Sequence, residues 1–220
     1  LIKYMSNRRN FIKKAALGTI GVSTVNTWSS TFVSDQTSNL ASSKKKPIII
    51  STWNHGFEAN DKALSELNIG KTALEAIVSG VGVCEADPNN RSVGYGGLPD
   101  REGKVTLDAC IMDHKFNCGS VSFLQNIENP ISVARKIMED TPHVMLSGKG
   151  AYNFAIEKGF KHKDLLIPET KLAWERWKST NEQKKPQINS ENHDTIGLLA
   201  IDNKGNISGA CTTSGWAYKL

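Results

Sequence analysis

The sequence predicts a mixed α+β fold in which helices pack against a sheet. Short apolar, β-branched runs stand at both ends of the region after residue 46, and helical patterns lie between them. A polar, glycine-containing turn joins the last two apolar runs into a hairpin. The chain has 220 residues, of which 39% are hydrophobic and 22% charged. This composition is typical of globular proteins, and the length allows one large or two small domains.

The first predicted elements are a strand and two helices. Residues 48–53 follow Pro47 and are predicted to form a buried strand. A helix is predicted around residues 60–67, because Asn60, Ala63, Leu64 and Leu67 share one helical face, and Gly70 should end it. A second helix is predicted from residue 71 to the Asp87-Pro88 pair.

The middle of the chain is predicted to alternate between loop, strand and helix. A glycine-rich loop over residues 92–100 precedes two strands, 105–112 and 119–124, which a turn over 113–117 connects. A helix should begin at Asn129-Pro130, since proline is tolerated in the first helical turn. A short strand over 144–146 and a helix over 151–158, ended by Gly159, follow.

The last part of the chain is predicted to hold a helix, a linker and a hairpin. The helix spans residues 169–178 with Trp174 and Trp177 half-buried. Residues 178–192 are polar and contain a proline, which is typical of a linker with nothing to bury. The hairpin strands are 195–202 and 207–213, on either side of a turn over 203–206.

The charge of the chain is concentrated at its beginning. Of the 27 basic and 22 acidic residues, eight basic and one acidic lie within residues 1–46, which leaves 19 basic and 21 acidic residues in the rest. The region after residue 46 is therefore close to neutral. We predict no nucleic-acid partner, because a broad cationic face is what such binding needs.

Residues 1–46 are predicted to be an export signal followed by a spacer. The segment Arg8-Arg9-Asn10-Phe11-Ile12-Lys13-Lys14 resembles the twin-arginine signal, and the uncharged run 15–25 has the length of a signal-peptide core but is too short to span a bilayer. Residues 23–43 hold eleven Ser or Thr in 21 positions, which is typical of a spacer. We expect a periplasmic protein with no membrane contact after export. The alternative is a chance basic cluster before an amphipathic helix.

Several cofactor sites are excluded by spacing. Ser147-Gly148-Lys149-Gly150 lacks the pattern of a phosphate loop, and Gly94-Tyr95-Gly96-Gly97 has no strand directly before it and no helix after it. The five His residues show no ligand spacing with Cys or acidic residues. We predict neither a metal nor a cofactor. Apolar contexts predict that three of the four cysteines (Cys84, Cys110, Cys118, Cys211) are core residues, and a cysteine hydrolase that uses Cys211 or Cys110 stays open.

The candidate for chemistry is Thr195. A polar linker leads through His193-Asp194 directly into a predicted strand that begins with this threonine. A cut between Asp194 and Thr195 would give the threonine a free α-amine, whose pKa of about 7.7–8 makes it a base close to the hydroxyl. A solvated strand edge with a turn-forming aspartate would have the same pattern.

Seven segments after residue 46 resemble the glycosylasparaginase family of N-terminal-nucleophile hydrolases. They occur in the family's order and extend from Pro47 to Leu220. The segments are Ser51-Thr52-Trp53-Asn54, Ser92-Val93-Gly94-Tyr95-Gly96-Gly97-x-Pro99-Asp100, Leu107-Asp108-Ala109-x-Ile111-Met112-Asp113, Asn129-Pro130-Ile131-Ser132-Val133-Ala134-Arg135, Thr141-Pro142-His143-Val144-Met145-Leu146, His193-Asp194-Thr195-Ile196-Gly197 and Gly209-Ala210-Cys211-Thr212-Thr213-Ser214-Gly215.

The resemblance implies a four-layer αββα sandwich and a precursor that cuts itself between Asp194 and Thr195. Residues 47–194 would form the α subunit and residues 195–220 the start of the β subunit. The mature enzyme would use Thr195 to split N4-(β-N-acetylglucosaminyl)-L-asparagine into aspartate and the amino sugar. A dimer of processed protomers, (αβ)2, is also implied.

The resemblance also implies roles for individual residues. Thr213 would bond near the nucleophile and tune it, and Asp194 would act only in self-cleavage. Trp53 would form a wall of the substrate pocket, with a plain core tryptophan as the alternative. His193 could be a mere neighbour of the cut.

The sequence departs from the family pattern after Thr195. Only 26 residues follow Asp194, and the arginine that grips the substrate carboxylate and the Thr-Gly segment of the oxyanion hole are not among them. We expect from this pattern a truncated, inactive and poorly soluble chain. Two alternative functions stay open. One is a threonine-type isoaspartyl peptidase/L-asparaginase, which usually has Gly-Thr-Val-Gly at the cut, and the other is a non-catalytic periplasmic protein that keeps the fold.

Overall fold

The computed structural model describes residues 46–180 and 195–220, which form one six-stranded sheet and five helices. The strands are β1 (Ile48–Ser51), β2 (Leu107–Met112), β3 (Cys118–Leu124), β4 (Met145–Ser147), β5 (Ile196–Ile201) and β6 (Ile207–Thr213). The helices are α2 (Gly56–Asn68), α3 (Ala73–Ala86), α4 (Pro130–Asp140), α5 (Gly148–Glu157) and α6 (Pro168–Thr180). The α+β class is confirmed.

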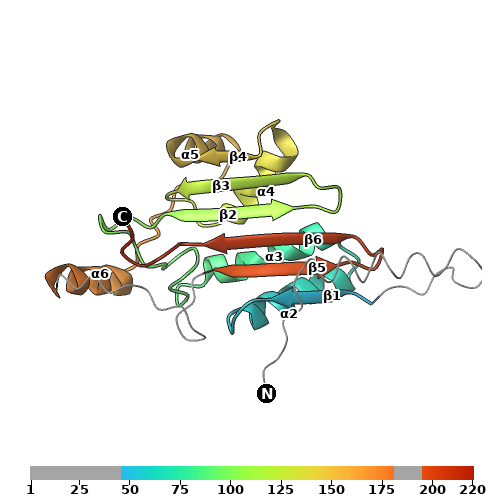
Figure 1. Ribbon diagram of the computed structural model, residues 1–220, viewed down its shortest axis with the longest axis horizontal. Coiled ribbons are helices and arrows are strands. Elements are labelled where there is room, and N and C mark those ends of the chain that lie inside the picture. Colours follow the sequence, from blue (N-terminus) through green and yellow to red (C-terminus); the bar gives the residue numbers. More distant parts are fainter. Residues whose placement is uncertain (1–45, 181–194) are drawn as a thin grey trace, which may run out of the picture. The chain divides into compact units, whose positions relative to one another are not determined.

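The strands lie in the order β1-β5-β6-β2-β3-β4 (Figure 1). Every neighbouring pair is antiparallel except β3 and β4, which are parallel. The predicted hairpin over 195–213 supplies the two strands β5 and β6 near the middle of the sheet. These two strands join the edge strand β1 to the β2–β3 pair, so segments far apart in the sequence share one sheet.

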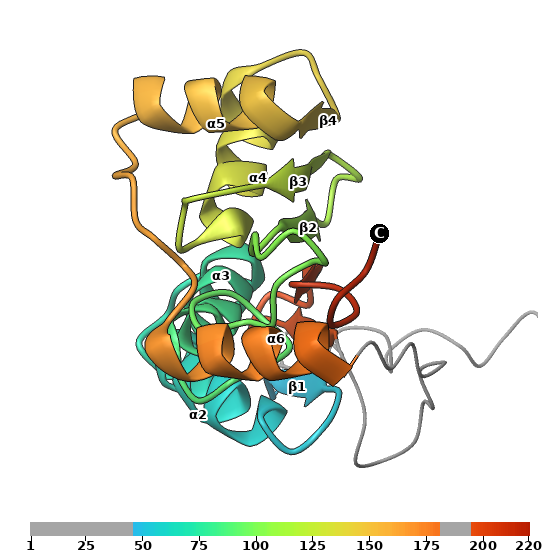
Figure 2. The ribbon, with the colours of Figure 1, turned by 90° about the vertical axis from the view of Figure 1, so that its left-hand side faces the viewer.

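The helices α2, α3 and α4 cover one face of the sheet, which we call the closed face (Figure 2). Alternate strand residues point into it, because successive side chains of a strand leave on opposite sides. The fully buried side chains there include Leu107 and Ile111 of β2, Ile196 and Leu198 of β5, and Ile77 of α3. This layer is the hydrophobic core of the described residues.

Local sequence signals set the limits of the helices. The Thr72 side chain accepts a hydrogen bond from the Glu75 backbone, and the Glu75 carboxylate accepts one from the Thr72 backbone. This capping box begins α3 two residues after the predicted start. Gly70 has φ +89°, a conformation that favours glycine, and it follows α2 as predicted. The helix predicted over 151–158 begins earlier, at Gly148.

The predicted turn of the hairpin is held by Asp202. Its carboxylate accepts hydrogen bonds from the backbone amides of Lys204 and Asn206, at 2.9 and 3.0 Å. The other carboxylate oxygen accepts a longer bond from the amide of Ala73, at the start of α3. One buried side chain therefore joins the turn to the helix layer.

The prediction of a buried first strand is wrong. β1 stops at Ser51, and the side chains of Ile48 and Ile50 are 52% and 63% exposed. The reason is position in the sheet, because β1 is an edge strand that pairs only with β5 and has helix α2 on one side only. A run of three isoleucines cannot distinguish an edge strand with one exposed face from a strand buried on both faces.

The second face of the sheet, which we call the open face, carries apolar side chains that the described residues leave exposed. We define it as the strand side chains that point away from α2, α3 and α4. Its exposed large apolar members are Ile48, Ile50, Met112, Met145, Leu199 and Ile207. A contiguous apolar surface of this kind marks a place where another layer or partner packs.

Helix α6 lies against the loop that follows the glycine-rich segment. The Trp174 Nε1 donates to the carbonyl of Arg101 at 3.2 Å, and Trp177 stacks on Tyr218 with ring centres 4.5 Å apart. Both tryptophans are half-buried, as predicted. Among the helices of the described residues, none has the length and apolar character needed to cross a bilayer.

Three predictions fall outside residues 46–180 and 195–220. The signal peptide and spacer occupy residues 1–46, of which only residue 46 is described. The linker lies almost wholly in the segment 181–194, and so do His193 and Asp194. The described residues contain one sheet layer, so the second sheet of the four-layer sandwich stays a prediction.

Candidate active site

Thr195 lies at the entrance to β5, exposed at one end of the sheet. Its backbone carbonyl accepts two hydrogen bonds from the segment that follows β1. The Thr52 hydroxyl donates one at 3.1 Å, and the Trp53 indole Nε1 donates the other at 2.9 Å. Thr195 is therefore held in place by a segment that is more than 140 residues away in the sequence.

Thr52 continues the pairing of β1 with β5 beyond the last residue of the strand. Its backbone amide donates to the carbonyl of Gly197 at 3.0 Å. Its hydroxyl accepts from the amide of Gly197 at 2.9 Å while it donates to the carbonyl of Thr195. One side chain thus satisfies backbone groups on both sides of Ile196. No local sequence signal predicts this role of Thr52, although the residue stands in a segment that resembles the family.

Trp53 is neither a strand residue nor a core residue. Its φ is +62°, in the left-handed region that non-glycine residues adopt at a cost of roughly 1–2 kcal/mol. The side chain is 38% exposed. Left-handed backbone at this position turns the chain sharply after β1, and the indole reaches the Thr195 carbonyl. Trp53 thus contacts the predicted nucleophile directly, and its role as a pocket wall stays a prediction.

Thr213 lies beside Thr195 in the register of the sheet. Ile196 pairs with Thr212, so the same antiparallel register places Thr195 opposite Thr213 at the end of the hairpin. On its other side Thr213 pairs with Asp108 of β2. Thr213 and Asp108 therefore share one row of the open face, and Thr195 stands directly before β5 at the same end of the sheet. We call these three residues the threonine row.

The Thr213 hydroxyl is connected to the glycine-rich loop. It donates to the carbonyl of Ser92 at 3.4 Å and accepts from the amide of Gly215 at 2.9 Å. The loop approaches α3 so closely that Gly94, with φ +65°, would place a Cβ atom 2.1 Å from the carbonyl oxygen of Glu85. Glycine is therefore required there, and the loop that contains it holds the Thr213 hydroxyl in place.

Asp108, the third member of the threonine row, was not singled out by the sequence analysis. Its carboxylate accepts a hydrogen bond from the amide of Phe123 at 3.0 Å, where the register of β2 and β3 shifts at a bulge. Phe123 has φ +54°, so the backbone of β3 bends at this position. The bulge places a carboxylate in a row that otherwise holds two hydroxyls, and no local sequence signal announces it.

A buried carboxyl lies under this row on the closed face. Glu85 of α3 is fully buried and accepts hydrogen bonds from the Thr212 hydroxyl at 2.7 Å and the Ile131 amide at 3.0 Å. Burial raises the pKa of Glu85 to about 8, and the hydrogen bonds it accepts oppose this rise. Glu85 joins α3, the start of α4 and β6 directly beneath the neighbour of Thr213.

The cysteines do not follow the prediction that three of four are core residues. Only Cys84 is buried, whereas Cys110 and Cys211 are exposed and Cys118 is half-buried. The cause is strand parity, because Cys110 and Cys211 point to the open face while their apolar neighbours point to the closed face. Cys84 donates a hydrogen bond to the His55 carbonyl. The alternative of a cysteine hydrolase that uses Cys211 or Cys110 stays a prediction.

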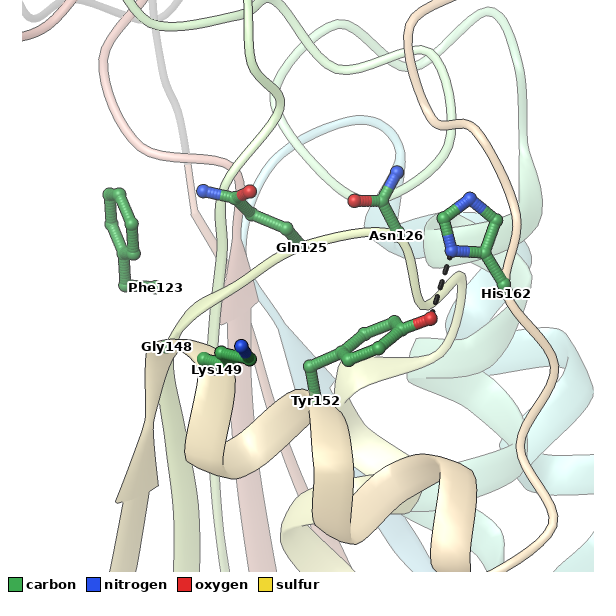
Figure 3. A pocket seen from close by; sticks show the side chains of 7 residues that line it. All are labelled: Phe123, Gln125, Asn126, Gly148, Lys149, Tyr152 and His162. Carbon is green, nitrogen blue, oxygen red and sulfur yellow. Dashed lines mark hydrogen bonds between the residues drawn. The ribbon is translucent and has the colours of Figure 1, made fainter.

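A cavity of about 490 Å³ lies beside the start of α5 (Figure 3), and one of its lining residues, Phe123, is the residue whose amide bonds Asp108 of the threonine row. None of the residues predicted as catalytic lines it. Within it the Tyr152 hydroxyl and His162 Nδ1 are hydrogen-bonded at 3.0 Å. The lining residues are Phe123, Gln125, Asn126, Gly148, Lys149, Tyr152 and His162. Within residues 46–180 and 195–220, no three His, Cys, Asp or Glu side chains gather as metal ligands would.

Comparison with known proteins connects this arrangement to one family. The sequence model of the family described as Asparaginase matches residues 52–220. A protein from Elizabethkingia miricola named N(4)-(beta-N-acetylglucosaminyl)-L-asparaginase is 52% identical over 98% of this chain and 62% of its own length. A Rattus norvegicus protein of the same name is 32% identical over 79% of this chain and 59% of its own length. The chain thus spans about three fifths of these relatives.

Proposed function

Since the chain belongs to the asparaginase family, we propose that it is an amidohydrolase that uses Thr195 as its nucleophile and splits N4-(β-N-acetylglucosaminyl)-L-asparagine. The products are L-aspartate and the amino sugar. The observation that carries the proposal is the position of Thr195, which is exposed at the start of β5, gripped by Thr52 and Trp53, and opposite Thr213. The names of the two relatives support this substrate.

The proposal includes a self-cleavage between Asp194 and Thr195. The Thr195 hydroxyl attacks the Asp194 carbonyl and displaces its own amine, which gives an ester that water then hydrolyses. The contacts of Thr195 suit such a step, since both donors bind its own carbonyl, which lies after the scissile bond. Cleavage would therefore remove none of them, and the new terminus would stay anchored. In this proposal the residues up to Asp194 form the α subunit.

In the cleaved enzyme the free amine of Thr195 takes the proton of its own hydroxyl. The hydroxyl oxygen attacks the side-chain carbonyl of the substrate, a β-aspartyl ester forms, and the amino sugar leaves with the returned proton. Water then releases L-aspartate. Thr213, whose hydroxyl lies in the same row and is fixed by Ser92 and Gly215, orients the nucleophile in this scheme. Trp53 forms a wall beside it.

The four-layer αββα sandwich is part of the same proposal. The closed face supplies one helix layer and one sheet layer, and the open face offers apolar side chains such as Ile50 and Leu199 to a second sheet. Two sheets that pack face to face bury such rows between them. The threonine row would then lie at one end of the space between the sheets. The relatives are longer than the part matched here, which is consistent with a further layer.

A second candidate function is a threonine-type isoaspartyl peptidase/L-asparaginase. The description of the matching family as Asparaginase favours it. It would use the same nucleophile on a β-aspartyl dipeptide or on asparagine. We place it second because the relatives carry the glycosylated substrate in their names and because His193-Asp194-Thr195-Ile196-Gly197 differs from the usual Gly-Thr-Val-Gly.

The decisive experiment is an intact-mass measurement of the purified protein, with Thr195→Ala and Thr195→Ser as matched variants. We expect two fragments in the parent, with a new amino terminus at Thr195, none in Thr195→Ala, and slower cleavage in Thr195→Ser, which keeps a hydroxyl. An uncleaved parent, or cleavage in Thr195→Ala, would contradict the proposal and favour the non-catalytic alternative. The processed protein is then offered the glycosylated asparagine and a β-aspartyl dipeptide, and faster turnover of the dipeptide would reverse the two candidates.

We also propose that residues 1–46 direct twin-arginine export to the periplasm and that the processed protein forms an (αβ)2 dimer. The export proposal rests on the order of the Arg8-Arg9 pair, the uncharged run 15–25 and the spacer. Arg8→Lys with Arg9→Lys should keep the protein in the cytoplasm, whereas normal export of this double variant would exclude the route. Sedimentation of the processed protein tests the dimer.

A further inference from the structure

We infer that the cavity beside the start of α5 is a binding site for a small organic acid with an aromatic body and a single carboxylate. No residue of the threonine row lines this cavity, and the inference does not rest on the proposed hydrolysis. Its evidence is the position of the cavity in the fold, the two aromatic rings in its wall, and a lysine whose charge has no partner among the described residues.

The cavity lies on the same side of the sheet as the helices. Helix α5 stands on the side of α2, α3 and α4 (Figure 2), and its buried Ala151 and Ala155 belong to the same hydrophobic core. Of the lining residues only Phe123 belongs to a strand, and the others come from α5 and from the loops after β3 and after α5. The second sheet of the proposed sandwich packs on the open face, so it would not cover this cavity.

The cavity has the size of a small-molecule site. Figure 3 shows the side chains of Gln125 and Asn126 on one side of it and those of Lys149 and Tyr152 on the other. Its volume of about 490 Å³ lies within the roughly 300–1,000 Å³ that is typical of ligand pockets. The space is therefore sufficient for a ligand that contains a ring system.

Two aromatic rings supply the apolar wall. The Phe123 ring lies against Gly148, where an added Cβ would be 3.8 Å from the ring carbon Cδ1, and the side chain is still 48% exposed. Tyr152 belongs to α5 and packs partly against the core. Aromatic rings stack on other rings or meet them edge to face, so a planar apolar ligand gains contact with both.

The polar groups at one end of the cavity are already bonded to each other. The Tyr152 hydroxyl and His162 Nδ1 are 3.0 Å apart, and the two rings meet edge to face at 84°. His162 Nε2 lies 3.4 Å from the Asp164 carboxylate, which also accepts a hydrogen bond from Asn126 Nδ2 at 3.4 Å. These contacts hold the end of the cavity in place and leave the Tyr152 ring available for apolar contact.

Lys149 supplies the charge that selects a carboxylate. The lining contains no acidic residue, and within residues 46–180 and 195–220 the Lys149 ammonium makes no ion pair. The first turn of α5 also lacks an acidic residue, and Ser147 forms no side-chain cap. The partial positive charge of the helix start therefore adds to that of Lys149. A carboxylate placed here gains a charge-assisted hydrogen bond.

The same features disfavour other ligand classes. A neutral sugar would leave the Lys149 charge without a partner. Phosphate would pair with this charge but would leave the rings of Phe123 and Tyr152 without contact. A metal cation would meet a lysine and no acidic lining residue. An aromatic monocarboxylate satisfies both the apolar wall and the single cation.

The test measures the binding of matched probes to the purified 220-residue protein by isothermal titration calorimetry. The probe 2-naphthoate carries a ring system and a carboxylate, 2-naphthamide carries the rings alone, and acetate carries the carboxylate alone. We expect 2-naphthoate to bind about tenfold more tightly than either of the others, and its affinity to fall as salt is added. Absence of saturable 2-naphthoate binding, equal binding of 2-naphthamide, or tighter binding of N-acetylglucosamine would overturn the inference.

Variants of the protein locate the bound probe. Lys149→Met keeps the length of the side chain and removes its charge, so it should weaken 2-naphthoate binding about tenfold and leave 2-naphthamide binding unchanged. Phe123→Ala should weaken the binding of both probes. Lys161→Met removes an exposed lysine outside the lining and is the matched control, which should bind as the parent does. Equal effects of Lys149→Met and Lys161→Met would overturn the inference. Far-UV circular dichroism shows that each variant retains its fold.

Discussion

The two faces of the sheet use the same strands for different purposes. On the closed face, Leu198 is 1% exposed and packs beneath the helix layer, while its neighbour Leu199 on the open face is 55% exposed. The open face carries the threonine row and the pair Cys110 and Cys211. Because side chains alternate along each strand, the closed-face residues form the core and the open-face residues include the candidate catalytic groups. A substitution on one face should change folding, and the substitution next to it should change the reaction.

We expect the largest difference between the two faces in the free energy of unfolding of alanine variants at Leu198 and Leu199. Leu198→Ala removes a fully buried side chain and leaves a cavity in the core, so we expect a loss of about 2–5 kcal/mol in the free energy of unfolding. Leu199→Ala removes a half-exposed side chain and should cost less than about 1 kcal/mol. Urea unfolding of both variants measures the difference. Equal losses would show that Leu199 is packed as closely as Leu198.

The next effect is the contribution of Glu85, which is buried between α3 and the closed face, to the pH dependence of the free energy of unfolding. Because the pKa of Glu85 is about 8 in the folded protein and near 4.5 when unfolded, the folded state binds more protons between these values. The stabilising effect of the protonated carboxyl is present below pH 4.5 and is lost as the pH rises through 8. The slope contributed should approach about 1.4 kcal/mol per pH unit.

The variant Glu85→Gln provides the control for this pH dependence. It keeps the shape and an acceptor for Thr212 and Ile131, and it does not titrate. Denaturant unfolding of parent and variant at intervals from pH 5 to pH 8 should show a steeper decline in the parent. Parallel curves would contradict the raised pKa. Glu85→Ala should be destabilised by roughly 1–3 kcal/mol at every pH, because two buried donors lose their acceptor.

A smaller effect is expected at Thr52, on the chemical side of the comparison. Thr52→Val keeps the shape of the side chain and removes the hydroxyl that bonds the Thr195 carbonyl and the Gly197 amide. We expect cleavage before Thr195 to slow by about tenfold, since loss of one such contact is worth about 1 kcal/mol or slightly more. Thr52→Ser should cleave at nearly the parent rate. Intact mass followed over time measures both.

The smallest effect is expected from Trp53→Phe. The phenyl ring retains aromatic area but cannot donate to the Thr195 carbonyl, so cleavage should slow by about threefold to tenfold. The free energy of unfolding should change little because Trp53 is partly exposed at the end of an edge strand. A loss of stability as large as that of Leu198→Ala would mean that the tryptophan belongs to the core after all.

Much of the fold could be predicted from local patterns. Thr72 and Glu75 specify the start of α3, Gly70 follows α2, and Asp202 stands at the predicted turn of the hairpin. These features depend on residues within a few positions of each other, so a sequence is sufficient to find them. The prediction of a buried β1 failed because edge or centre is a property of the strand order, which local patterns do not contain.

Some residues of the candidate site could likewise be found from the sequence, and others only from the structure. Thr195 and Thr213 were found from a linker-to-strand junction and from family resemblance, whereas Thr52, Asp108 and Glu85 were not. Asp108 reaches the threonine row through a bulge, and Glu85 reaches Thr212 from a helix 127 residues away in the chain. Contacts of this range require the strand register, and a shift of one residue would turn each side chain to the other face.

Periodicity, caps and turn residues that lie close together in the chain were sufficient to locate the helices and the hairpin. The tertiary structure alone decided which face each strand residue points to and which residues share a row. It placed Cys110 opposite Cys211 and Thr213 between Thr195 and Asp108. The physical reason is that side-chain neighbours in a sheet are set by hydrogen-bond register between distant segments, and that register is settled only when the whole sheet forms.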